Sequence, residues 1–121
     1  MIGKIYSSIT PFYDSKNGTN SFKRRPVLII GGPRNNDYTV LPVSTITRKQ
    51  HIDPDYDVKV EPVQYPNLNQ ISYIRTHKQT TVHMTSLIRE IGDMKREYEE
   101  LYLSVLEKLE NFNKMVMNDA L

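Results

Sequence analysis

Three short segments of the sequence combine cations with hydroxyl or aromatic side chains in a way that suits contact with phosphate groups. In the first, Lys23, Arg24 and Arg25 stand directly before Pro26 and an apolar run. A guanidinium at the start of a buried strand is held more rigidly than one on a free loop, and its planar fork matches a phosphate. The alternative is that these cations flank the strand and prevent edge pairing.

The second segment places hydroxyl groups before cations, just after another apolar run. Ser44, Thr45 and Thr47 are followed by Arg48 and Lys49. The hydroxyls can donate to phosphate oxygens, and the cations can follow a nucleic-acid backbone. The alternative is an ordinary polar turn.

The third segment sets an aromatic residue beside cations. Tyr73 is followed by Arg75, His77 and Lys78. That combination suits single-stranded nucleic acid, because bases stack on the ring while the cations neutralise phosphates. The alternative is a strand end with one core tyrosine. Because all three segments lie at strand ends, we favour a shared nucleic-acid contact over three unrelated features.

Motifs for other kinds of catalysis are missing. The sequence has no GxGxxG, P-loop or GxSxG motif, and no cysteine that could serve as a nucleophile or thiolate ligand. His51, His77 and His83 lack metal-ligand spacing relative to one another, so we expect surface or loop histidines. We therefore expect neither a cofactor nor a metal.

One acidic cluster has the spacing of half a calcium loop. Asp53, Asp55 and Asp57 alternate with other residues, but Pro54 interrupts them and the glycine and glutamate of such a loop are missing. We interpret the cluster as a solvated turn.

Length and composition favour one folded domain. The chain has 121 residues, of which 38% are hydrophobic and 25% charged. No apolar run approaches the ~20 residues that span a bilayer, and the N-terminus lacks the pattern of a signal peptide. The absence of cysteine permits a reducing setting. We expect a cytoplasmic protein without membrane contact.

The charge is distributed unevenly. Residues 1–52 carry a net charge of +6 and residues 53–121 one of −4, within a total of +2. Such a chain can present a basic face to a polyanion such as RNA or DNA, although folding can also mix the charges.

The chain changes its hydrophobic pattern after residue 92. Before it, all seven prolines punctuate short apolar runs, which predict short strands. The expected strands are residues 3–8, 25–31, 38–43, 56–60, 69–74 and a stretch within 88–91. We interpret residues 9–22 as a long loop and expect an edge or a bulge at Pro42.

The C-terminal third has the period of a helix. Apolar residues form one stripe with steps of three and four: Met94, Tyr98, Leu101, Val105, Leu109, Phe112 and Val116. With Asp93 as N-cap, this predicts one helix over residues 93–113 and a frayed tail at 114–121. Leu103 and Leu106 widen its apolar surface enough to contact a partner chain. The whole predicts a mainly β single domain, a small curved barrel over residues 1–92 with a covering helix.

The order of several motifs resembles the MazF/PemK (Kid) toxins of type II toxin–antitoxin systems. These motifs are GxI at residues 3–5, RPVLII at 25–30, LPVSTIT at 41–47, IRTHKQ at 74–79 and Ile-Gly at 91–92. A polar strand before the last motif and a final helix after it complete the order. The resemblance covers nearly the whole chain, and the spacing of the motifs is more specific than any one of them.

The resemblance implies an SH3-like barrel of the PemK/MazF/CcdB type, usually a homodimer. It implies a metal-independent endoribonuclease that cuts single-stranded RNA by attack of the 2′-OH, and an antitoxin that binds through a disordered acidic segment. Arg25 then corresponds to the arginine that stabilises the phosphate or acts as general acid, and Thr45, with Ser44 beside it, to the hydroxyl that holds the phosphate. Arg75 is implied in structure or RNA contact.

The chain departs from the family pattern in three places, one of which is a C-terminal helix longer than the family's, with the tail at residues 111–121. Many relatives carry an acidic residue shortly before the arginine equivalent to Arg75, whereas residues 69–74 here contain none. Residues 9–22 match no relative closely. A CcdB-like gyrase poison and a catalytically silent RNA-binding module of the same fold therefore remain as alternatives.

Overall fold

The computed structural model describes the backbone of residues 1–121 and every side chain except that at position 67. The strands are β1 Lys4–Asp14, β2 Thr19–Arg34, β3 Asp37–Thr45, β4 Asp57–Val60, β5 Ser72–Arg75, β6 Thr80–His83 and β7 Leu87–Asp93. The α-helices are α1 Met94–Glu97 and α2 Glu99–Ala120. Short 3-10 helices are η1 Lys49–His51, η2 Pro66–Leu68, η3 Thr76–Lys78 and η4 Met84–Ser86.

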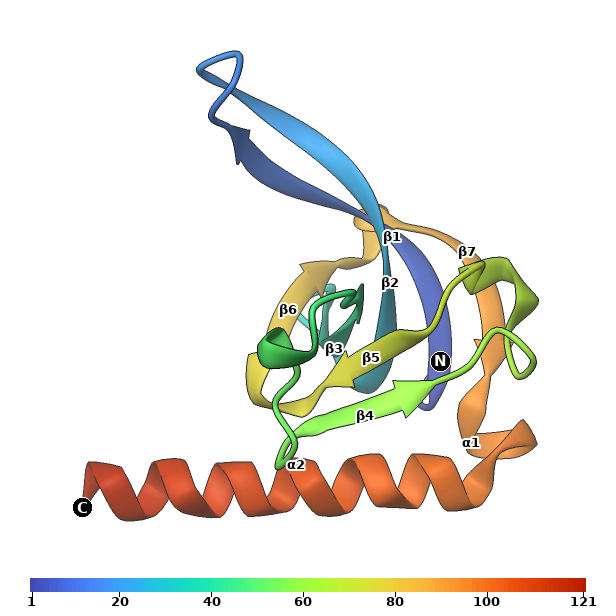
Figure 1. The fold of residues 1–121 in the computed structure, drawn as a ribbon, viewed down its shortest axis with the longest axis vertical. Helices are drawn as coiled ribbons and strands as arrows, with labels where there is room; N and C mark the ends of the chain where they lie inside the picture. The colour runs from blue at the N-terminus through green and yellow to red at the C-terminus, as the bar shows by residue number, and fades with distance from the viewer.

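The strands form one curled antiparallel sheet with α2 lying along one side of it (Figure 1). Its order is β4-β5-β3-β2-β1-β7, with β6 paired to β3. The mainly β class with a C-terminal helix is thus confirmed. Within the described chain, no helix has the length and apolar character needed to cross a membrane.

Strand β3 changes partner part-way along its length, and this bends the sheet. Its residues 37–40 pair with β6, and its residues 43–45 pair with β5. Pro42 lies between these two stretches and is itself opposite Val27 of β2. Proline has no N–H to donate to a ladder, so it fits the break between two pairings. The sequence predicts an edge or a bulge at Pro42, whereas the structure has a change of partner there; the register shifts between β2 and β3 lie between Ile29 and Gly31 and between Gly31 and Arg34.

The two faces of the sheet bury different apolar clusters. Because side chains alternate along a strand, Leu28 joins the larger cluster, which includes Met94 and Val105 from the helices. Val27 and Ile29 point the other way and join a smaller cluster with Tyr38 and Val40. The smaller cluster lies on the face that α2 does not cover, which is the face that carries the site described below.

The predicted loop over residues 9–22 is wrong, because most of it is a long two-stranded arm. Strand β1 continues to Asp14, β2 begins at Thr19, and the two pair in register from Ile9↔Arg24 to Asp14↔Thr19. Only residues 15–18 form the turn, where Gly18 has φ 66° and its N–H donates to the carbonyl of Asp14 at 2.8 Å. The arm projects from the body of the molecule (Figure 1).

The helix is longer than predicted and has a break near its start. Asp93 is the predicted N-cap: its carboxylate accepts from the Arg96 N–H, and its own N–H donates to Glu97. The chain leaves helical geometry at Tyr98, with φ −137° and ψ 63°, and α2 then runs to Ala120. The frayed tail at 114–121 is therefore wrong. The break also shifts the phase of the helix, so that Tyr102 is buried although it stands outside the predicted stripe.

One strand prediction needs a smaller correction, and one glycine in β7 has a packing role. Strand β5 begins at Ser72 and not at position 69, because Asn69 has φ 63° and follows the turn of η2. Gly92 of β7 is required for packing, since a Cβ there would overlap the ring of Tyr65. That ring is 3% exposed, and burial raises the pKa of its hydroxyl.

Candidate active site and nucleic-acid interface

Two adjoining hollows open on the sheet face opposite α2, and they share three polar residues. Arg25, Ser44 and Arg75 line both of them. The smaller, of about 340 Å³, is completed by the end of β3 and the segment after it, with Thr45, Ile46, Thr47, Arg48 and His51. The larger, of about 580 Å³, extends toward β6 and the base of the arm. Strands β2, β3 and β5 thus bring residues of all three predicted segments to one surface.

Arg25 and Thr45 meet at the smaller hollow. Arg25 is half-buried on β2, where its carbonyl accepts a hydrogen bond from the Ser8 hydroxyl at 3.0 Å. Thr45 is exposed at the end of β3. Both residues therefore line this hollow, and neither is sealed in the core. By the alternation of side chains along β3, Ser44 shares the face of Arg25, and Thr45 reaches the hollow from the end of the strand. A phosphate in the hollow would meet a guanidinium from β2 and hydroxyls from β3.

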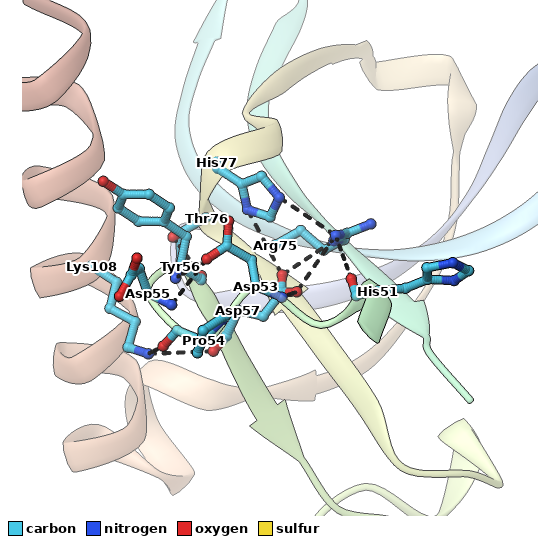
Figure 2. Close-up of polar contacts among 10 residues, drawn as sticks. All are labelled: His51, Asp53, Pro54, Asp55, Tyr56, Asp57, Arg75, Thr76, His77 and Lys108. Atoms are coloured by element: carbon cyan, nitrogen blue, oxygen red, sulfur yellow. Dashed lines mark hydrogen bonds and ion pairs between the residues drawn. The ribbon is translucent and has the colours of Figure 1, made fainter. Parts of the chain in front are cut away.

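Arg75 is held at the junction of the two hollows by a buried carboxylate (Figure 2). Its Nε lies 3.1 Å from Oδ1 of Asp57, whose side chain is 0% exposed. Its Nη2 donates to the carbonyl of His51 at 3.4 Å. Asp57 of β4 and Arg75 of β5 are direct neighbours in the antiparallel pairing of these strands.

The solvated-turn interpretation is correct for part of the acidic cluster and wrong for Asp57. The Asp53 carboxylate makes a turn, accepting from the N–H groups of Asp55 and Tyr56. Asp57 is buried in β4 beside Arg75. A carboxylate from the neighbouring strand therefore lies beside Arg75, although residues 69–74 contain none. No local spacing indicates this, because the pairing of β4 with β5 decides it.

His77 also differs from its prediction as a surface or loop histidine. It lies in η3 with its side chain only 14% exposed, its Nε2 3.4 Å from Nη2 of Arg75 and its Nδ1 3.8 Å from Asp57. Its ring packs near Tyr56 and Phe112. His51, by contrast, is exposed and lines the smaller hollow. The sequence patterns place His77 only within the third segment and give His51 no place near the other two segments.

The arm separates the cations of the first basic segment. In the antiparallel pairing, Lys23 is opposite Thr10 and shares the face of Arg25, whereas Arg24 is opposite Ile9 and points to the other face. Lys23 also lies over the ring of Phe12, 4.9 Å from its centroid. A ligand in the hollows can therefore continue along Lys23 but not along Arg24.

The other predicted contact residues are distributed around the hollows. Thr47 and Arg48 line the smaller hollow and Lys78 lines the larger. Tyr73 is opposite Ser44 in the sheet, but it lines neither hollow, and Lys49 stands exposed in η1. Among the described side chains, no group of three or more His, Cys, Asp or Glu residues is arranged to hold a metal ion.

Comparison with solved structures finds the same fold. The chain is similar to the Mycobacterium tuberculosis toxin MazF-mt6, with 23% identity, a TM-score of 0.66 and coverage of 92% of this chain and 96% of the other. It is also similar to a crystal structure of an "Mtb toxin", with 24% identity, a TM-score of 0.57 and coverage of 85% and 99%. These likenesses confirm the predicted fold of the MazF/PemK type.

Sequence comparisons give the family. No curated protein matches the chain. The model of the PemK-like, MazF-like toxins of type II toxin–antitoxin systems matches residues 4–111, which is nearly the whole length. The resemblance seen in the ordered motifs is thereby confirmed, and the chain belongs to the PemK-like, MazF-like toxin family of type II toxin–antitoxin systems.

Proposed function

We propose that this toxin is a metal-independent endoribonuclease that cleaves single-stranded RNA through attack by the RNA's own 2′-OH. The observation that carries the proposal is the convergence of Arg25, Thr45 and Arg75 on one open hollow. Two guanidinium groups and a hydroxyl line this hollow, where the proposal places the bridging phosphate. Such preorganised donors stabilise charge that develops in a transition state.

In this reaction the 2′-oxygen bonds to the adjacent phosphorus and the bond from phosphorus to the 5′-oxygen breaks. The products are a 2′,3′-cyclic phosphate and a 5′-OH. Arg25 and Arg75 stabilise the negative charge of the pentacoordinate phosphorane, and Thr45 donates a hydrogen bond to a phosphate oxygen. Arginine stays protonated in proteins, so its contribution is electrostatic.

The proton of the attacking 2′-OH needs an acceptor. A neutral imidazole accepts a proton near pH 7 more readily than any other common side chain. His51 lines the smaller hollow with Arg25 and Thr45, and it takes this role in our proposal. The leaving 5′-oxygen takes a proton from solvent.

Product ends distinguish this reaction from other kinds of cleavage. Incubation of a long single-stranded RNA with the pure protein in EDTA should give fragments with 2′,3′-cyclic phosphate and 5′-OH ends. An Arg25→Ala protein, purified in parallel, controls for contaminating ribonuclease. An absolute requirement for magnesium, or fragments with 5′-phosphate ends, would contradict the mechanism.

The two faces of the arm allow a matched test of where the RNA runs. Lys23→Ala should weaken binding of an uncleavable 2′-O-methyl RNA and lower the slope of log affinity against log salt by about 0.7, because one phosphate contact is lost. Arg24→Ala removes the same charge from the opposite face and should leave the slope unchanged. Fluorescence anisotropy over a salt series measures both. Equal slopes for the two variants would place the RNA elsewhere.

Family membership implies an antitoxin partner. In our proposal a disordered acidic segment of that antitoxin covers the basic hollows, and the toxin is a cytoplasmic homodimer. The outer face of α2 supports a contact between two copies, since Leu103 and Met117 are 55% and 60% exposed. Exposed apolar residues on one helix face are typical of interaction surfaces.

A further inference from the structure

Asp57 is a buried carboxylate with a defined set of partners. Its Oδ2 accepts from the N–H of Asp53 at 2.8 Å, and its Oδ1 accepts from Nε of Arg75 at 3.1 Å. A buried carboxylate without such partners would be strongly destabilising. The folded chain therefore keeps Arg75 beside Asp57, because the guanidinium compensates the buried negative charge of the carboxylate.

These contacts lie on one side of the Arg75 guanidinium, and one of its terminal nitrogens points away from them (Figure 2). Arg75 also lines both hollows. Its hydrogen bonds to described residues use Nε and Nη2, with the carboxylate of Asp57, the carbonyl of His51 and Nε2 of His77. Nη1 remains for a ligand. A guanidinium held at two of its nitrogens presents the third in a fixed direction, which lowers the entropy lost when a phosphate binds.

His77 contacts the Arg75 guanidinium, so its tautomer depends on where that guanidinium lies. Since Nη2 of Arg75 can only donate, Nε2 of His77 must accept, and the ring proton of neutral His77 is then on Nδ1. Nδ1 lies 3.8 Å from Oδ1 of Asp57, beyond hydrogen-bond distance, and has no hydrogen-bond partner among the described residues. The contact with Arg75 thus predicts one neutral tautomer of His77, and Asp57 contributes by holding Arg75 in place.

Helix α2 supports the same unit from the other side. Nζ of Lys108 donates to the carbonyls of Pro54 and Asp57, at 3.3 and 3.4 Å. The ring of Phe112 packs edge-on against Tyr56, with centroids 5.1 Å apart. The helix therefore anchors the turn before Asp57 and the start of β4, which limits the freedom of the carboxylate.

We propose that Asp57 is a positioning residue that fixes the Arg75 guanidinium at the junction of the two hollows, with His77 as the third member of the arrangement. The proposal rests on the proposed ribonuclease function. Asp57 is buried behind Arg75 and acts on the RNA only through it.

The test compares Asp57→Asn with Asp55→Asn, alone and with Arg75→Ala. Asp57→Asn keeps the size of the side chain but removes its charge, and we expect a 10- to 100-fold lower kcat on a single-stranded RNA that the wild type cleaves. Asp55→Asn removes an exposed carboxylate two residues away and should leave kcat unchanged. In the Arg75→Ala background, Asp57→Asn should lower kcat no further.

A purely structural role gives a different pattern. It would lower activity by the same factor with and without Arg75, and such additivity would overturn the proposal, as would an unchanged kcat in Asp57→Asn. Circular dichroism melts show whether each variant folds. If Asp57→Asn does not fold, Asp57→Glu keeps the charge but displaces the guanidinium, and it should show the same loss of kcat and the same non-additivity.

A second readout does not depend on cleavage. Nitrogen-15 NMR of the histidine side chains should show His77 as the Nδ1–H tautomer in the wild type and in Asp55→Asn, and a changed tautomer mixture in Asp57→Asn. An unchanged signal in Asp57→Asn would contradict the arrangement. A wild-type protein that cleaves no RNA would instead overturn the proposed function and leave the NMR result to decide the role of Asp57.

Discussion

Replacing Arg25 with alanine is expected to lower the rate constant of RNA cleavage by about 100- to 1000-fold, which is the usual effect of removing one preorganised donor to a developing oxyanion. Arg25 is half-buried at the start of the apolar part of β2 and lines both hollows. Its backbone accepts from Ser8, a contact that alanine keeps. The fold should therefore survive while cleavage, and the inhibition of growth on expression, are lost.

Arg34→Ala provides the matched control for this result. Arg34 is an exposed arginine at the other end of the same strand, away from both hollows. Its replacement removes the same charge and should change the cleavage rate little. Single-turnover kinetics on one RNA, with thermal melts of all three proteins, measure both outcomes. Toxicity and cleavage that survive in Arg25→Ala would refute the ribonuclease proposal.

The second large effect concerns the core beneath the site. Ile74→Ala should lower the free energy of unfolding by about 2–5 kcal/mol, because Ile74 is 0% exposed and its loss leaves a cavity. It lies between Val43 and Val58 in the sheet, directly before Arg75. The position of Arg75 on β5 therefore depends on the packing of Ile74 in the core.

Ile71→Ala is the control, since Ile71 is the same residue type three positions earlier and is 43% exposed. Its replacement should change the free energy of unfolding by less than about 0.5 kcal/mol. Urea unfolding at equilibrium, fitted to a two-state model, compares the two variants. Equal stability losses would mean that β5 is not packed as the structure describes.

Local patterns in the sequence predicted the elements that depend on local physics. The apolar runs at residues 25–31 and 38–43 lie in β2 and β3, because consecutive branched residues suit strands buried on both faces. Asp93 caps the helix as its position predicts. The ordered motifs were enough to indicate the family, since their spacing follows the strand order of the barrel.

Other features were mispredicted where a distant or later segment decides the local structure. The sequence predicts a loop over residues 9–22 because turn-forming residues are frequent there and the alternation of apolar and polar residues is weak. In the structure, the two strands of the arm supply each other's hydrogen-bond partners. The helix extends past residue 113 partly through contacts such as that of Met115 with Tyr56, and its break at Tyr98 changes which residues are buried.

The sequence by itself determined which residue types the site can use: arginines beside apolar runs, hydroxyls after the apolar part of β3, and no cysteine. Only the tertiary structure decided which of them meet. Pairing of β4 with β5 buried Asp57 beside Arg75, and the pleat of the arm kept Lys23 with Arg25 while turning Arg24 away. The physical reason is that register and pleat set the direction of every side chain on a sheet, and both depend on strands far apart in the chain.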